Sequence, residues 1–174
     1  MKSRMWFIPI AVISFALNVS GCKKGDGDNS IYNVSDSVFV SKASMANFAE
    51  ITAGQIAADS ALDPSIAQFG EMMVSEHTMA QQQLQSIASQ LGISISNTLD
   101  QEHQMFVDSL LDLKGRAFDS VYIHRQVVDH EKVIDFFKNE SGHGLQKDIK
   151  SYMYLTLRNV TMHLTAARTL AQNY

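Results

Sequence analysis

Apolar residues recur every three or four positions along most of the chain, the spacing of an α-helix that buries one face. The pattern predicts four long helices and one shorter helix, over residues 35–61, 64–91, 116–139 and 145–172 and over 98–113 respectively. Asp63 followed by Pro64 favours a helix start, and Gly92 favours a helix end. Because no strand-like alternation competes with this pattern, we expect an all-α fold.

Four long helices of similar length predict a helical bundle. If the 98–113 segment runs back along the bundle, the second and third long helices are parallel, which is the ferritin-like crossover arrangement. We therefore predict an all-α, ferritin-like four-helix bundle with a short extra helix in the crossover between the second and third long helices. The length fits a single domain over residues 35–174.

Each long helix carries one strongly polar residue within its apolar stripe; these residues are Glu50, His77, His130 and His163. At a rise of about 1.5 Å per residue, His77 and His130 should share one level in parallel helices. Glu50 falls within a few ångströms of that level, whereas His163 falls about a turn and a half away from it. The pattern predicts that at least three polar side chains meet inside the bundle.

A buried carboxylate and buried imidazoles are costly unless they are paired. One solution is a transition metal, because neutral imidazoles and a carboxylate suit zinc, iron, manganese or copper. The alternative is a metal-free hydrogen-bonded network in which Glu50 accepts from histidines. An acid–base pair of Glu50 and a histidine in a hydrolase is a third interpretation, but no nucleophile motif accompanies it. We therefore predict no catalytic residues.

Asp119 and Tyr122 precede His130 by three and two helical turns and share or border its face. They are candidates for holding a histidine in one tautomer. Alternatively, Asp119 caps its helix and Tyr122 packs in the core. Three glutamates are assigned to the solvated faces of the helices, namely Glu71, Glu76 and Glu131.

The first residues have the layout of a secretory signal, with Lys2 and Arg4 before an apolar run that is too short to span a membrane. The run ends in Val19-Ser20-Gly21-Cys22, which resembles the lipobox cleaved before a lipidated cysteine. We predict a lipoprotein signal peptide over 1–21, lipidation of Cys22 and a flexible tether over 22–34. An ordinary signal peptide that leaves a free thiol is the alternative.

The anchor predicts a location in the cell envelope, with the membrane as a partner. Lys23 stands where an aspartate would resemble an inner-membrane retention signal, so the outer membrane facing the periplasm is favoured. With Cys22 as the single cysteine, no internal disulfide can form. The net charge is negative, which argues against nucleic acid as a partner.

Several segments together resemble the bacterial "domain of unknown function 4142" family. They are Phe48–Ile51, Phe69–His77 (FGEMMVSEH), Phe118–Tyr122 followed by His130, and Met162–Leu164. The likeness extends over about 35–170. It implies a secreted or outer-membrane protein with a ferritin-like bundle, and the family's matching glutamate, histidines and Phe-Asp-x-x-Tyr motif map onto the residues named above. The resemblance implies no particular activity.

Overall fold

The chain folds into five helices, which a computed structural model describes over residues 34–95, 97–142 and 144–174. The helices are α1 (Val34–Ser60), α2 (Pro64–Leu91), α3 (Gln101–Leu111), α4 (Gly115–Glu140) and α5 (Lys147–Ala171). The predicted all-α fold is confirmed, and the predicted helix ends differ from these by at most three residues. The predicted signal peptide, Cys22 and the tether up to residue 33 lie outside the described residues.

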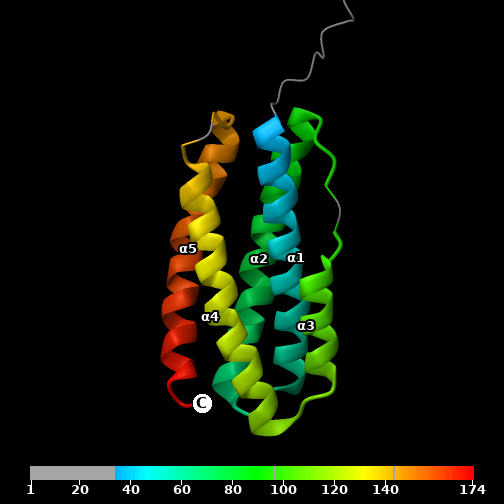
Figure 1. Cartoon of the computed structure of the whole chain (residues 1–174), viewed down its shortest axis with the longest axis vertical. Helices are drawn as coiled ribbons and strands as arrows, with labels where there is room; N and C mark the ends of the chain where they lie inside the picture. Colours follow the sequence, from blue (N-terminus) through cyan, green and yellow to red (C-terminus); the bar gives the residue numbers. More distant parts are fainter. Residues whose placement is uncertain (1–33, 96, 143) are drawn as a thin grey trace, which may run out of the picture.

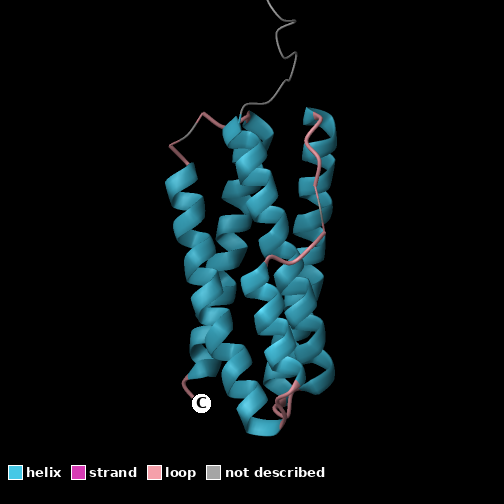
Figure 2. Cartoon of the chain, turned by 45° about the vertical axis from the view of Figure 1, so that its right-hand side comes forward, coloured by secondary structure: helices cyan, strands magenta, loops and turns pink. Residues whose placement is uncertain are grey.

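The four long helices lie side by side, and α3 lies along one side of them (Figure 1). Helix α1 packs on α2 and α4 packs on α5, so the chain forms two helical hairpins. The hairpins meet through α2 with α5 and through α1 with α4. After α2 the chain runs back along the side of the bundle before α3 begins (Figure 2). As a result α2 and α4 run in the same direction, as predicted.

Helix α2 has the ends that its sequence predicts. The Asp63 side chain accepts a hydrogen bond from the Ser65 backbone amide at 2.8 Å, and Pro64 occupies the first turn. Gly92 closes the helix in the left-handed conformation, with φ of 73°.

Helix α1 begins earlier than predicted, so Asp36 lies in its first turn. There the buried Asp36 carboxylate accepts from the Gln146 amide at 2.8 Å and ties α1 to the segment before α5.

Two glycines let α1 and α2 approach closely. A side-chain carbon at Gly54 would lie 2.9 Å from the Gly70 carbonyl oxygen, and one at Gly70 would lie 2.6 Å from the Gly54 carbonyl oxygen. Any larger residue would push the two backbones apart. This contact fixes the spacing of the first hairpin.

The apolar core includes two large clusters along the bundle and a small third cluster of Ile134, Val160 and Leu164 on α4 and α5. The cluster near the α1 start includes Phe39, Val40, Leu84, Phe137, Ile149, Tyr152 and Met153. The cluster near the α1 end includes Ala57, Ile66, Phe69, Met73, Phe118, Tyr122 and Ala167. The residues between the two clusters along each helix include most of the buried polar side chains, so the bundle has a polar layer at its middle.

Candidate metal centre

The polar layer brings together one or more side chains from each of the four long helices. Its buried members are Asn47, Glu50, His77, Gln81, Gln126, Asp129, His130, Thr156 and His163. Each of these side chains is at most 8% exposed, so the layer is largely shielded from solvent. The layer is therefore an environment of low dielectric constant, in which an unpaired polar group is costly.

Three histidines meet in this layer. His77 comes from α2, His130 from α4 and His163 from α5, and each is at most 6% exposed. The His163 ring centroid lies 5.4 Å from both other ring centroids, and His77 and His130 are 5.9 Å apart. One ring nitrogen from each residue lies within 4.8 Å of the other two. The three rings thus form a compact triad, which we call the histidine triad.

The structure corrects the predicted depth of His163. Its ring lies as close to His77 as to His130, so the predicted offset of a turn and a half is wrong. That offset assumed that all helices end at the same level. Helix α5 instead ends before it reaches the turn between α3 and α4, which raises His163 to the level of the other two rings (Figure 1).

The hydrogen bonds of His77 determine its tautomer. Its Nδ1 lies 3.1 Å from Asn47 Oδ1, while Asn47 Nδ2 donates to Gln81 and to the Tyr152 hydroxyl. Because the Asn47 oxygen can only accept, His77 Nδ1 carries the proton. The lone pair of His77 is therefore on Nε2.

His130 and His163 are held in the same manner by acceptors. His130 Nδ1 donates to the Gln126 backbone carbonyl at 2.8 Å, and His163 Nε2 donates to the Glu76 carboxylate at 2.9 Å. These bonds leave the lone pairs on His130 Nε2 and His163 Nδ1. Each ring of the triad thus has one nitrogen fixed by an acceptor on its own side of the layer.

The other nitrogen of each ring is buried without a partner. His77 Nε2, His130 Nε2 and His163 Nδ1 have no hydrogen-bond partner among the residues that the structure describes. A buried polar atom left unsatisfied costs about 1–3 kcal/mol. Three such lone pairs in one triad are the feature that a metal ion would satisfy, and acceptor bonds behind the rings are typical of metal-ligating histidines.

Burial also sets the charge of the triad. Desolvation lowers the pKa of His130 to about 4 and lowers the pKa of His77 well below its usual value. Desolvation and the neighbouring His130 lower the pKa of His163, although Glu76 opposes the shift. All three imidazoles are therefore neutral near pH 7, which is the form that binds metals.

Glu50 adjoins the triad without belonging to it. Its Oε1 lies 3.7 Å from His130 Nδ1, the nitrogen that already donates to Gln126. Burial and the nearby Asp129 raise the pKa of Glu50 to about 8, so the carboxyl group is largely protonated at neutral pH. Its Oε2 is buried and has no hydrogen-bond partner within the described chain.

Asp119 lies at the end of the bundle. Its carboxylate accepts from the backbone amides of Leu62 and Asp63, both at 2.9 Å, and the Tyr174 hydroxyl lies 3.3 Å away. None of these groups belongs to a histidine. Asp119 therefore fixes the turn between α1 and α2.

Tyr122 packs within the apolar cluster near the α1 end. Its ring stacks on Phe118 with centroids 6.2 Å apart, and it is fully buried. Burial, together with the charge of nearby Glu50, raises the pKa of its hydroxyl well above the usual value. Its hydroxyl has no partner in the part of the chain that the structure describes. The predicted role of Tyr122 in orienting a histidine stays a prediction.

The assignment of Glu76 to the solvated face is wrong. Its side chain is partly buried and its carboxylate is the acceptor that orients His163. Asn47, which orients His77, was not singled out by the sequence pattern either. The sequence does place Glu76 directly before His77, and Asn47 one turn before Glu50, but neither position indicates a contact with a distant helix.

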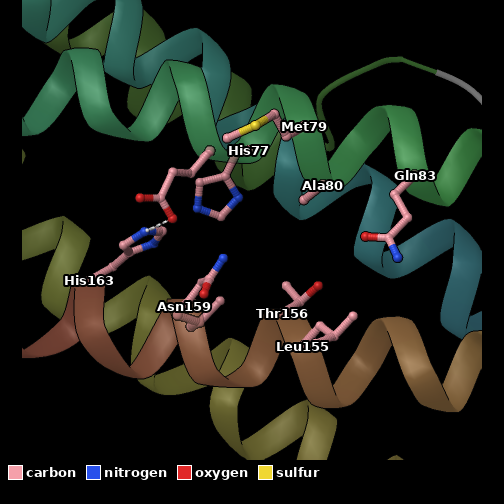
Figure 3. Close-up of a pocket in the computed structure, with 10 residues that line it drawn as sticks. His77, Met79, Ala80, Gln83, Leu155, Thr156, Asn159 and His163 are labelled. Carbon is pink, nitrogen blue, oxygen red and sulfur yellow. Dashed lines mark hydrogen bonds and ion pairs between the residues drawn. The ribbon is translucent and has the colours of Figure 1, made fainter.

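An open pocket leads from the protein surface to the triad. It lies between α2 and α5, has a volume of about 180 Å³, and is lined by both His77 and His163. Figure 3 shows these two rings facing each other across the gap between the helices, with Thr156 and Asn159 pointing into it from α5. The pocket therefore reaches two of the three rings, while their unpartnered nitrogens stay buried behind it.

The fold and the site together define the protein as an all-helical bundle with a buried histidine triad that could hold a metal ion. The chain belongs to the family described as Domain of unknown function (DUF4142), whose model matches residues 24–170. No curated protein and no solved structure matches the chain. Across the described residues, no helix combines the length and the hydropathy of a membrane span.

Proposed function

We propose that this protein binds one divalent transition-metal ion on His77, His130 and His163 and sequesters it at the cell envelope. The observation that carries the proposal is the set of three buried lone pairs, one on each ring, none of them partnered within the described residues. A single ion would satisfy all three nitrogens at once. Without such an ion, each of the three buried nitrogens lacks a hydrogen-bond partner and lowers the stability of the folded state.

The ligand set favours particular metals. Neutral imidazoles bind zinc, copper, nickel and ferrous ions well, whereas magnesium and calcium prefer oxygen ligands. Zinc–nitrogen bonds of about 2.0–2.1 Å would require ring nitrogens roughly 3.4 Å apart in a tetrahedral site. One nitrogen of each ring lies within 4.8 Å of the other two. Movements of the ring nitrogens by about an ångström would bring them to the spacing of a tetrahedral site.

Glu50 has a supporting role in this proposal. It lies on the Nδ1 side of His130, away from the nitrogen that lacks a partner. A cation on the triad would favour the ionised form of Glu50 because opposite charges attract at short range. Glu50 would then balance part of the charge of the ion through the His130 ring.

Metal stoichiometry tests the proposal directly. The purified protein, stripped with a chelator and then dialysed against zinc or copper, should retain about one ion per chain by elemental analysis. His130→Ala should abolish retention, whereas His124→Ala, an exposed histidine on the same helix, should not. Circular dichroism of both variants checks that the bundle stays folded.

A metal-free network is the competing outcome. Asn47, Gln81, Tyr152 and His77 already form a connected set of hydrogen bonds. If the folded wild-type protein retains no metal, the layer serves only to fix the register of the helices. The protein is then a structural or interaction protein of the envelope.

The location rests on the sequence before the bundle. We propose that cleavage before Cys22 and its lipidation attach the protein to a membrane, with the outer membrane favoured by Lys23. Radiolabelled fatty acid should enter the wild-type protein and not the Cys22→Ser variant. Label in both forms, or in neither, would contradict the anchor while leaving the metal site unaffected.

A further inference from the structure

A row of carboxamide side chains connects the histidine triad to the crossover segment, residues 92–100 between α2 and α3. His77 Nδ1 donates to Asn47 Oδ1 at 3.1 Å, and Asn47 Nδ2 donates to Gln81 Oε1 at 3.2 Å. Gln81 Nε2 donates to Asn97 Oδ1 on the crossover at 2.7 Å. Asn47 and Gln81 are buried, whereas Asn97 is exposed. We call these three carboxamides, Asn47, Gln81 and Asn97, the amide relay, and it runs from the triad to the surface.

The hydrogen bonds of the amide relay all point the same way. Asn47 and Gln81 each accept on the side of the triad and donate on the side of the crossover. A carboxamide carries a donor nitrogen and an acceptor oxygen on one carbon, so turning it over reverses its hydrogen bonds. The hydroxyls of Tyr152 and Ser44, which accept from Asn47 at 2.9 Å and from Gln81 at 2.8 Å, can also donate. The relay can therefore be satisfied in either of two directions.

The direction of the relay decides which nitrogen of His77 carries the proton. In the observed direction the proton is on Nδ1, and the lone pair is on the buried Nε2 that has no partner among the described residues. In the reverse direction Asn47 would donate to Nδ1, and the proton would be on Nε2. Because a protonated nitrogen has no lone pair for a metal ion, only the observed direction prepares His77 for coordination.

We propose that Asn97 is a positioning residue, which acts through Gln81 and Asn47 to hold His77 in the tautomer that binds metal. As the outer end of the relay, it accepts the last hydrogen bond, across 16 positions of the chain. This inference deepens the proposed function and rests on it for the effect on metal affinity. It makes the crossover segment a regulator of the triad.

Substitutions at position 97 test the inference with opposite expected results, because aspartate only accepts hydrogen bonds and lysine only donates them. Nitrogen NMR of the imidazole rings in the metal-free full chain reports the tautomer. His77 should be protonated mainly on Nδ1 in the wild type and in Asn97→Asp, and the fraction protonated on Nε2 should rise in Asn97→Lys. Zinc affinity, measured by competition with a chelating dye, should fall about tenfold in Asn97→Lys and be kept in Asn97→Asp.

Ser94 provides the control for charge, because it is exposed and lies on the same segment outside the relay. Ser94→Lys and Ser94→Asp introduce the same charges as the substitutions at position 97. Both should leave the His77 tautomer unchanged and should change zinc affinity little. Circular dichroism of all four variants checks that the bundle stays folded.

The outcomes separate this inference from the proposed function. Zinc bound at one ion per chain, with the same His77 tautomer in the wild type, Asn97→Asp and Asn97→Lys, would overturn the inference and leave the metal site standing. An equal loss of affinity in Asn97→Lys and Ser94→Lys would assign the loss to charge and also overturn it. A protein that binds no zinc but changes its His77 tautomer with position 97 would overturn the proposed function and support the control of His77 by Asn97.

Discussion

Glu50 is a carboxylic acid buried in the polar layer. Burial and Asp129 raise its pKa to about 8 in the folded protein, from an ordinary value of 4.5. The folded state therefore holds a proton that the unfolded chain releases above about pH 4.5. Glu50 disfavours folding progressively as the pH rises from 4.5 toward 8, because the unfolded chain is then ionised at this position.

Replacing Glu50 with glutamine should remove this pH dependence. We expect the metal-free Glu50→Gln variant to be stabilised relative to wild type by on the order of 3 kcal/mol more at pH 8 than at pH 5. Urea unfolding at the two pH values measures the difference. Glu71→Gln, at an exposed position on α2, is the control and should show no such difference. An equal effect of Glu50→Gln at both pH values would mean that the carboxyl group titrates normally.

Glu76 affects the metal through a different ring. Its carboxylate accepts from His163 Nε2 at 2.9 Å and so raises the basicity of the Nδ1 that faces the triad. Glutamine at this position can still accept the hydrogen bond but lacks the charge. We expect Glu76→Gln to weaken zinc binding about tenfold, measured by competition with a chelating dye. Glu71→Gln should leave the affinity unchanged, and equal losses in both variants would point to a general effect of charge.

At the scale of the helices, the close approach of α1 and α2 depends on Gly54 and Gly70. A side-chain carbon at Gly70 would lie 2.6 Å from the Gly54 carbonyl oxygen, 2.8 Å from the Ala58 amide nitrogen and 2.9 Å from the Ala57 side chain. Two of these neighbours are backbone atoms, which cannot rotate away. The two helices must therefore separate to accept alanine.

The prediction is that Gly70→Ala destabilises the protein by about 1–3 kcal/mol, even though alanine favours helix formation. Thermal unfolding compares it with Gly142→Ala, where the added carbon would meet nothing within 4 Å. If Gly70→Ala raised the melting temperature, the helix propensity would outweigh the contact. The spacing of α1 and α2 would then be adjustable.

The helices could be predicted because each one carries a local pattern. A stripe of apolar residues, the Asp63–Pro64 start and the Gly92 end depend only on neighbouring positions in the chain. The histidines of the triad could be found for the same reason, since a polar residue interrupts each stripe. The pairing of Gly54 with Gly70 could not, because either glycine alone is compatible with an isolated helix.

The orienting groups depend on distant parts of the chain. Glu76 and His163 are 87 positions apart, and Asp119 reaches amides 56 and 57 positions away. Neither contact leaves a periodic signal in the sequence. The level of His163 depends on where α5 ends relative to its neighbours, which the pattern within α5 does not contain. Sequence periodicity thus indicates which residues enter the core, while packing between helices determines their partners.

At the scale of the whole molecule, the triad joins the two hairpins. His77 belongs to the α1–α2 hairpin, and His130 and His163 belong to the α4–α5 hairpin. The contacts within each hairpin are more extensive than those between α2 and α5 or between α1 and α4. A metal ion on the triad would therefore act as a cross-link at the weaker boundary of the bundle.

Because unfolding would separate the three ligands, metal binding should stabilise the fold. With zinc at about one hundred times its dissociation constant, the gain is about 2.7 kcal/mol, or roughly 5–10 °C in melting temperature for a chain of this size. Scanning calorimetry with and without zinc measures the shift, and excess chelator should reverse it. His77→Ala should abolish the shift by disconnecting the α1–α2 hairpin, whereas His103→Ala, whose ring pairs with Asp100 on the side of the bundle, should retain it. A shift that survives His77→Ala would mean that zinc binds within one hairpin or on the surface, and that the boundary between the hairpins is held by packing alone.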